Sequence, residues 1–275
     1  MNICMHENGW TPIIKDVNWK EITQDQINKI AKLLLTNTML VAHQDNLTSD
    51  DEVRIGSMFG QVEQYSADLI NDNFILKNGG SNHILRVTGE KDEHGSEGMF
   101  GHVTELDWHC NRVTQPDRKP IIWLFSERGS VGSRTSYINF HMVYNDLTDK
   151  QKVEYETLEL DVGEDAFSEY YNNPKFGRYY PKMIHTNALG IKSLFMPYTQ
   201  VHFIKDWDKP TSRKLIEQLR DMLLDPKYIY HHDWQDHDIV IADQWSGIHK
   251  RWEFAGMPNR VLHRMAVDYS NTLYT

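Results

Sequence analysis

Short apolar runs with strand character fill the last part of the chain and restrict what it can fold into. Three of them lie at 228–234, 239–243 and 260–267, and the polar turn Gln235–Asp238 joins the first two. Runs of similar character recur earlier in the chain, at 39–43, 84–87, 120–125, 135–138, 193–196 and 200–204. Since many short strands at close spacing are typical of two packed sheets or a barrel, the pattern predicts a mainly β protein with a double-sheet core.

Helices are expected mostly near the N-terminus, packed outside the sheets. Thr23 and Gln26 have the spacing of a capping box, and apolar residues at helical spacing follow them, so a helix is predicted over 24–36. Thr48 begins a second capped helix. This helix is predicted to end at Gly60, because glycine commonly terminates a helix.

The rest of the chain is predicted to contain two further helices and one irregular segment. A capping box begins at Thr148, and apolar residues on one face mark an amphipathic helix over 215–223. Aromatic residues among asparagine, glycine and proline at 163–183 favour an insert or lid; packing of these rings over a large sheet is the alternative. No repeat or linker interrupts the sequence, so 1–275 is predicted to form a single domain.

The charge balance excludes one class of partner. Acidic residues outnumber basic ones by 39 to 29, whereas nucleic-acid-binding surfaces are basic. Residues 1–7 lack the charged start and apolar core of a signal peptide, and no run approaches the about 20 apolar residues that span a bilayer. The two cysteines, Cys4 and Cys110, provide no disulfide framework. We therefore expect a cytoplasmic protein that binds neither nucleic acid nor a membrane.

The segment Glu105–Asn111 carries the first candidates for chemistry. If it is a strand, His109 and Asn111 point to the same side, and Glu105 and Asp107 share that side with them. Two donors on one face can bind one metal ion. A strand with a single hydrogen-bonded histidine is the alternative, so the interpretation depends on a third ligand elsewhere in the chain.

The C-terminal region supplies further candidates. His249 follows a predicted strand and a turn, and Arg260 and Arg264 share one face of another predicted strand. A charge buried in a mostly apolar strand needs a partner. The partner would be either Asp243 in an ion pair or a small carboxylate held in a bidentate contact. Two histidines and one oxygen ligand, with open positions, form the ligand set of non-haem Fe(II) oxygenases.

In this order, the motifs resemble those of the taurine dioxygenase-like family of Fe(II)/2-oxoglutarate-dependent oxygenases. The family carries Glu-Leu-x-Trp-His-x-Asp, which 105–111 matches except at its last position, and Asp-x-x-x-x-x-His, which 243–249 matches. An Arg-x-x-x-Arg strand follows at 260–264, and Thr135 comes after a glycine-containing turn as in the family. The match covers nearly the whole chain.

The resemblance implies a fold, a reaction and a set of site residues. The fold would be a double-stranded β-helix, a jelly-roll or cupin-like core with flanking helices. The reaction would be hydroxylation or desaturation of a small, anionic or amino-acid-like molecule by dioxygen, while 2-oxoglutarate becomes succinate and carbon dioxide. Association into homo-oligomers is common in the family. The implied residues are His109, Asn111 and His249 for Fe(II), Arg260 and Thr135 for 2-oxoglutarate, and Arg264, Glu105 and Tyr198 for the substrate. Arg264 would either bind an anionic group of the substrate or support Arg260.

Asn111 is the main departure from the family pattern, because it stands where the family has a carboxylate. An amide oxygen is neutral and a weaker metal ligand than a carboxylate. Three hypotheses follow. Asn111 binds the metal through its amide oxygen in an active oxygenase; an external anion or water takes the position, as in related halogenases; or the chain is a catalytically silent homologue that binds metal or ligand for another purpose.

Overall fold

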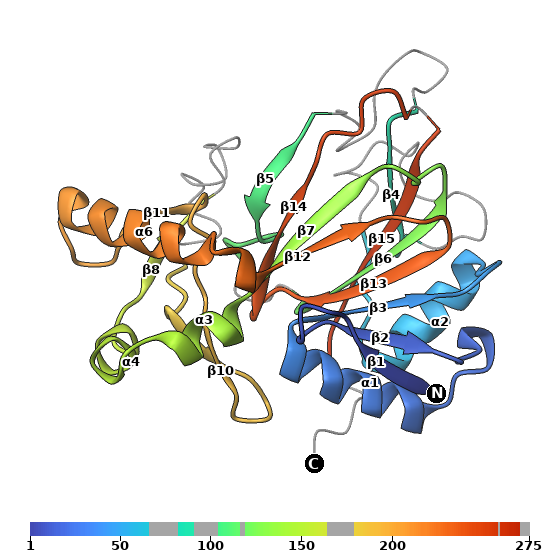
Figure 1. Cartoon of the computed structure of the whole chain (residues 1–275), viewed down its shortest axis with the longest axis horizontal. Helices are drawn as coiled ribbons and strands as arrows, with labels where there is room; N and C mark the ends of the chain where they lie inside the picture. The colour runs from blue at the N-terminus through green and yellow to red at the C-terminus, as the bar shows by residue number, and fades with distance from the viewer. Residues whose placement is uncertain (66–81, 91–103, 116–118, 164–178, 258, 270–275) are drawn as a thin grey trace.

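The computed structural model describes residues 1–65, 82–90, 104–115, 119–163, 179–257 and 259–269 (Figure 1). Most of its strands belong to two sheets. The larger sheet has the order β1-β2-β3-β13-β6-β15-β4 and the smaller one β12-β7-β14-β5. The strands of the larger sheet are β1 (Asn2–Met5), β2 (Pro12–Lys15), β3 (Met39–His43), β13 (Asp238–Asp243), β6 (Ile121–Arg128), β15 (Val261–Val267) and β4 (Leu85–Thr88). Those of the smaller sheet are β12 (Ile229–Asp233), β7 (Arg134–Asn139), β14 (Gly247–Arg251) and β5 (Leu106–His109).

An apolar layer joins the two sheets. Val41, Leu124 and Val240 of the larger sheet belong to the same buried cluster as Tyr137 and Tyr230 of the smaller one. The pairing partners along the larger sheet are antiparallel except for β2 with β3, so each strand presents alternate residues to this layer. The predicted mainly β, double-sheet architecture is therefore confirmed.

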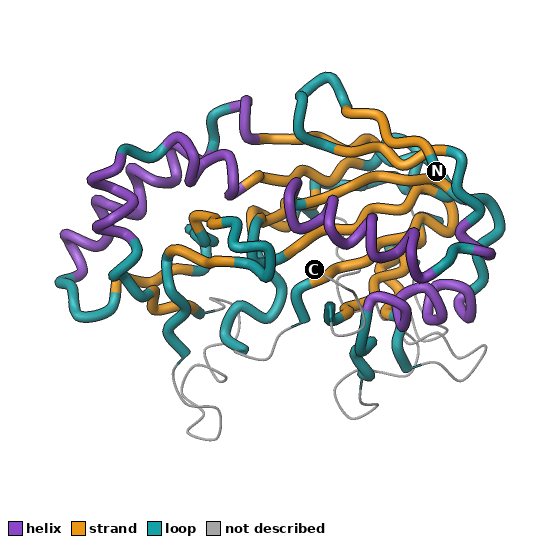
Figure 2. Tube along the Cα trace, turned by 90° about the horizontal axis from the view of Figure 1, so that it is seen from below, coloured by secondary structure: helices purple, strands orange, loops and turns teal. Residues whose placement is uncertain are grey.

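Helices cover the outer face of the larger sheet at one end of the molecule and form a separate group at the other (Figures 1 and 2). The first group is α1 (Gln24–Asn37) and α2 (Ser49–Phe59), with the short helix η1 (Trp19–Glu21). Both α1 and α2 begin with the predicted capping boxes, and Ile27, Ile30 and Phe59 are among the side chains that they bury against the sheet. The capped N-termini and apolar faces explain why these segments are helical.

The second group of helices packs with two small sheets. It contains α3 (Phe140–Asp146), α4 (Asp149–Tyr155), α6 (Lys209–Leu223) and η4 (Pro226–Tyr228). The small sheets pair β9 (Ile184–Thr186) with β10 (Lys192–Leu194) and β8 (Leu160–Val162) with β11 (Val201–Ile204). The capping box at Thr148 and the amphipathic helix around 215–223 are confirmed. Residues 164–178 of the predicted insert lie outside the described residues.

Several strands were not predicted from the sequence, and one of them carries a site residue. β14 (Gly247–Arg251) contains more polar than apolar side chains, so no strand pattern marks it. It becomes a strand because it pairs along both edges, with β7 and with β5. Helix α3 was also missed.

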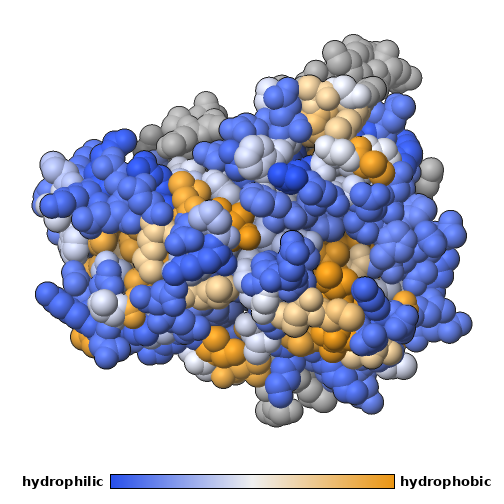
Figure 3. Space-filling view, viewed as in Figure 1, coloured by the Kyte–Doolittle hydropathy of each residue, from blue (hydrophilic) through white to orange (hydrophobic). Residues whose placement is uncertain are grey.

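One face of the molecule is mostly polar (Figure 3). Figure 3 shows this face, on which apolar side chains gather only in small, separate patches. Among the described residues, no helix has the length and apolar character needed to cross a membrane.

A buried ionic cluster joins α2 to the larger sheet. His263 of β15 donates from Nδ1 to Glu52 at 2.6 Å and from Nε2 to Glu127 at 2.9 Å. Glu52 is fully buried and also accepts a hydrogen bond from the indole of Trp123 at 3.0 Å. Burial alone would lower the pKa of His263, but the two carboxylates outweigh it and raise this pKa to about 9. His263 is therefore an imidazolium at neutral pH.

Candidate active site

Two histidines face each other across neighbouring strands of the smaller sheet. His109 ends β5, and His249 lies directly opposite it in β14. Their ring centroids are 4.2 Å apart and their planes are inclined by 52°. His109 Nδ1 donates to the backbone carbonyl of Asp107 at 2.7 Å, which leaves its Nε2 as the electron-pair donor. The predicted pairing of these two histidines, 140 residues apart in the sequence, is thus present in the structure.

Both imidazoles are neutral at physiological pH. Burial lowers the pKa of His109 to about 4, and the charges of Arg264 and Arg251 contribute in the same direction. Burial, the neighbouring His109 and the same arginines hold the pKa of His249 well below its ordinary value. A histidine must be neutral to bind a metal ion. The pair is therefore in its metal-binding form.

Asn111 does not lie in the strand from which its orientation was predicted. Strand β5 ends at His109, so strand alternation does not place Asn111 beside it. Instead, Asn111 lies in a turn whose backbone is held by Gln244: the Asn111 N–H donates to the Gln244 side-chain oxygen at 2.7 Å. Arg112, the next residue, has φ of 54°, in the left-handed region. Among the described residues, no hydrogen-bond partner contacts the buried Nδ2 of Asn111.

Strict alternation predicted that Glu105 and Asp107 share the side of His109, but in the structure both carboxylates contact Lys250. The register between β14 and β5 shifts after the His249–His109 pair, so that Arg251 opposes Leu106. The two carboxylates lie 3.2 and 3.5 Å from the Nζ of Lys250, the residue after His249. Both are largely exposed. In this arrangement Asp107 contributes its backbone carbonyl to His109, and its carboxylate is engaged elsewhere.

Arg260 is a buried cation with unused donor capacity. It immediately precedes β15, is 1% exposed, and donates from Nε to Ser133 Oγ at 3.1 Å. Its guanidinium lies 4.5 Å from the ring centre of Phe254. Its Nη1 is buried without a hydrogen-bond partner among the described residues. Burial and the neighbouring charge of Arg251 lower the pKa of Arg260 to about 9, so it remains charged at neutral pH.

The alternative ion pair with Asp243 is not found. The Asp243 carboxylate accepts a hydrogen bond from the backbone N–H of Trp245 at 2.8 Å, which shapes the turn before His249. The contacts described for Arg260 are those with Ser133 and Phe254. The predicted need for an anionic partner is therefore not met by Asp243.

Strand β7 carries two further buried side chains, Thr135 and Tyr137. Thr135 is buried, and its Oγ1 accepts from the Trp234 indole at 2.9 Å. Tyr137, two residues on, stacks on His249 with ring centroids 6.1 Å apart. The Tyr137 hydroxyl is buried and has no hydrogen-bond partner among the described residues. The positive charge of Arg260 acts on the pKa of this hydroxyl and lowers it, against the larger effect of burial. Tyr137 was not predicted as a site residue, although it lies two residues after Thr135 on a predicted strand and therefore shares its face.

A close backbone approach holds the segment that leads to Arg260. Gly129 has φ of +65°, and a side chain there would meet the carbonyl oxygen of Asn259 at 2.7 Å. Glycine is therefore required at this turn. It allows the chain before β7 to lie directly against the residue that precedes Arg260.

Two predicted substrate residues lie near the histidine pair. The charge of Arg264 acts on both His109 and His249. Tyr198 is partly buried, and its pKa is raised by burial and by the nearby charge of Asp107. The adjoining residue Thr199 donates to the backbone carbonyl of Trp108 in β5. The segment around Tyr198 therefore lies alongside the strand that carries His109.

Comparison with known proteins decides the family. A sequence model described as "Taurine catabolism dioxygenase TauD, TfdA family" matches residues 9–266. The chain belongs to this family. The TauD/TfdA assignment agrees with the order of motifs, from the segment 105–111 to the arginines at 260 and 264.

Curated relatives and solved structures agree with the TauD/TfdA assignment. The chain is 24% identical to a (S)-phenoxypropionate/alpha-ketoglutarate-dioxygenase of Sphingobium herbicidovorans, over 78% of this chain and 77% of the relative. It is 22% identical to pentalenolactone F synthase of Streptomyces avermitilis, over 91% and 88% of the two chains. The structure of AAD-2 with Mn(II) and N-oxalylglycine superposes with a TM-score of 0.73 at 17% identity, covering 97% of each chain. The expected jelly-roll core is thereby confirmed.

Membership of the TauD/TfdA family makes the chain a 2-oxoglutarate-dependent dioxygenase, with Fe(II) and 2-oxoglutarate as its cofactor and co-substrate. The side chains fit these groups. Two neutral imidazoles are available to a metal ion. The buried Arg260 Nη1 and Tyr137 hydroxyl offer hydrogen bonds that are unused among the described residues, as a bound carboxylate would require.

Proposed function

We propose that this enzyme hydroxylates a small anionic or amino-acid-like molecule, with desaturation as the alternative outcome of the same reaction. The supporting observation is the combination of two facing neutral histidines with a buried arginine, Arg260, whose Nη1 has no hydrogen-bond partner among the described residues. We assign Fe(II) to His109, His249 and Asn111. When bound, Fe(II) and 2-oxoglutarate together supply the oxidising power for attack on a carbon–hydrogen bond. We also propose that 1–275 forms one oxygenase domain.

Arg260 and Thr135 are proposed to hold 2-oxoglutarate. A guanidinium binds a carboxylate strongly when both are shielded from water, and Arg260 is almost completely buried. The Trp234 indole uses one lone pair of the Thr135 hydroxyl, which directs the hydroxyl proton toward another acceptor. The hydroxyl of Tyr137, which lies in β7 with Thr135, adds a third hydrogen-bond donor to those of Arg260 and Thr135. These groups would orient the co-substrate and exclude water from it.

Arg264 is proposed to bind an anionic group of the substrate, with Tyr198 and Glu105 as further contacts. Arg264 is half-buried in β15, and its charge already acts on the metal-binding histidines. Two relatives are named for phenoxypropionate and 2,4-dichlorophenoxyacetate, both carboxylates, which supports an anionic substrate here. Glu105 is paired with Lys250 in the described structure, so it would contact a substrate only from the outer side of β5.

Formation of succinate tests the proposed function. Under anaerobic conditions, Fe(II) plus 2-oxoglutarate should produce the weak visible absorption band of a keto acid chelated to iron. On admission of oxygen, candidate amino acids and small carboxylates should be screened for succinate release and for oxidised product by mass spectrometry. Absence of both the absorption band and succinate, under all conditions, would contradict the proposed oxygenase activity. It would favour the hypothesis of a catalytically silent homologue.

Asn111→Asp should raise the affinity for Fe(II) about tenfold or more, because it replaces a neutral amide oxygen with a carboxylate next to a dication. Isothermal titration under anaerobic conditions measures the change. Asn145→Asp is a matched control, since it adds the same charge at an exposed position in α3. Equal affinities for Asn111→Asp and wild type would remove Asn111 from the metal site. Halogenated product in the presence of chloride would instead support an external anion at this position.

A further inference from the structure

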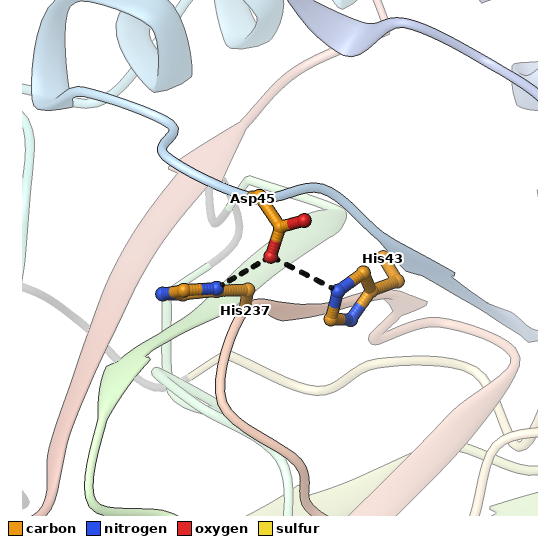
Figure 4. Close-up of side chains that lie close together, drawn as sticks. All are labelled: His43, Asp45 and His237. Atoms are coloured by element: carbon orange, nitrogen blue, oxygen red, sulfur yellow. Dashed lines mark hydrogen bonds and ion pairs between the residues drawn. The ribbon is translucent and has the colours of Figure 1, made fainter.

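A second group of metal-binding side chains lies on the surface, at the edge where β3 ends (Figure 4). His43 is the last residue of β3, Asp45 follows it, and His237 lies in the turn between β12 and β13. Asp45 Oδ1 is 2.8 Å from His237 Nδ1 and 3.4 Å from His43 Nε2. One ligand atom from each residue lies within 4.8 Å of the other two. All three side chains are accessible to an ion from solution.

A buried carboxylate orients His43. Asp238 lies opposite His43 in the sheet, and its Oδ1 is 3.1 Å from His43 Nδ1. The Asp238 side chain is only 11% exposed and also accepts from the Gln235 backbone N–H at 2.9 Å. Hydrogen bonding of one imidazole nitrogen to a carboxylate, with the other nitrogen turned to the metal, is the common arrangement around protein-bound zinc.

His43 therefore lies between two carboxylates. A neutral imidazole has one N–H and can satisfy only one of them. With that proton directed to Asp238, the Nε2 lone pair faces Asp45, and two electron-rich groups lie 3.4 Å apart. A cation between them removes this repulsion. The cation is either a second proton on His43 or a metal ion.

His237 is held in place before any ion binds. Its φ is 70°, in the left-handed region that non-glycine residues seldom adopt. Its ring is stacked on Phe125 with centroids 6.3 Å apart and planes within 12°. Its backbone N–H donates to Ser126 at 2.7 Å, and its carbonyl accepts from Gln44 at 3.1 Å. Nδ1 is thus presented to Asp45 by a fixed ring.

We propose that His43, Asp45 and His237 bind a divalent ion of the zinc class at this surface, separately from the oxygenase site. Zinc ligands lie about 2.0–2.2 Å from the ion, which places them roughly 3.3–3.6 Å apart in a tetrahedron. Of the two separations measured here, the 3.4 Å between Asp45 and His43 lies in that range, and the 2.8 Å between Asp45 and His237 lies below it. Two imidazoles with one carboxylate favour zinc, nickel or copper over magnesium or calcium. Water would complete the coordination.

The bound ion would fasten two segments distant in the sequence. It would join the connection from β3 to α2 with the turn from β12 to β13. That turn begins with Trp234, whose indole donates to Thr135 of the proposed co-substrate site. An ion that binds only the folded state stabilises it by mass action, so zinc should raise the melting temperature.

Counting bound zinc tests this assignment. The metal-free full-length chain is dialysed against Zn²⁺, and bound metal is measured by mass spectrometry, alongside thermal unfolding with and without Zn²⁺. We expect Asp45→Asn and His43→Gln each to bind one zinc ion fewer than wild type. Each variant should also lose part of the zinc-induced rise in melting temperature, because it lacks this zinc ion. Because the result is a difference between proteins, it does not depend on how much metal the oxygenase site takes.

Two further proteins complete the experiment. His202→Gln removes an exposed histidine from β11 and should bind as much zinc as wild type. Asp238→Asn keeps the three ligands but weakens the orientation of His43, so zinc affinity should fall about tenfold or more. Equal zinc content in Asp45→Asn and wild type would overturn the proposal. A melting-temperature rise of the same size with Mg²⁺ would also overturn it.

Discussion

Replacing Arg260 with glutamine should raise the 2-oxoglutarate concentration for half-maximal succinate formation about a hundredfold or more, and should not destabilise the ligand-free enzyme. Removing one partner of a buried charged pair costs roughly 2–5 kcal/mol of binding free energy, and about 2.7 kcal/mol is a factor of one hundred. In the ligand-free protein, however, Arg260 is a buried cation whose Nη1 has no partner among the described residues. Neutralising it removes an uncompensated charge. Initial rates against 2-oxoglutarate and thermal unfolding measure the two effects.

Arg251→Gln is the matched control. Arg251 also lies over the ring of Phe254, with its guanidinium carbon 5.2 Å from the ring centre, but its Nη2 donates to the carbonyl of Thr104 at 2.9 Å. We expect a smaller change in the 2-oxoglutarate requirement and a loss of stability. If Arg251→Gln had the larger effect on 2-oxoglutarate, the co-substrate carboxylate would belong to Arg251 and the assignment to Arg260 would be wrong.

The histidines and arginines could be proposed as site residues from the sequence because each belongs to a short motif, at 105–111, 243–249 or 260–264, that can be recognised without knowing the fold. His109 lies in a strand, as expected, and Arg260 lies next to β15 instead of inside the predicted strand. The register shift between β14 and β5 could not be predicted, because it depends on how two strands about 140 residues apart meet. It is the reason why the carboxylates of Glu105 and Asp107 lie beside Lys250.

The position of Asn111 shows the same limit. Alternation along a strand predicts a side chain only as far as the strand extends, and β5 stops at His109. What fixes Asn111 is the side chain of Gln244, 133 residues further on, which accepts from its backbone N–H. The cluster of His43, Asp45 and His237 was missed for a similar reason. Its members are brought together by the antiparallel pairing of β3 with β13.

Replacing His263 with leucine should lower the free energy of unfolding by roughly 3–5 kcal/mol, the usual cost of leaving a buried charge without its partner. The uncompensated charge would be the carboxylate of Glu52, which is fully buried and would retain the Trp123 indole as its hydrogen-bond donor. Urea unfolding at neutral pH measures the difference. The double variant Glu52→Gln, His263→Leu should recover part of the loss, because no carboxylate then remains buried beside the leucine. Equal stability of the single variant and wild type would contradict the assigned ion pair.

The same cluster predicts how wild-type stability depends on pH. The pKa of His263 is raised to about 9 in the folded protein, above its ordinary value near 6.5. A group with a raised folded pKa stabilises the protein fully below its unfolded pKa, and the contribution is lost as the pH rises through the folded pKa. For a shift of this size the loss is roughly 3 kcal/mol between about pH 6.5 and 9. Conversely, the hydrogen bond from His263 lowers the pKa of Glu127, so its contribution is present above the ordinary glutamate pKa and lost in acid. The free energy of unfolding should therefore be greatest between these ranges, and the alkaline decline should be reduced in His263→Leu.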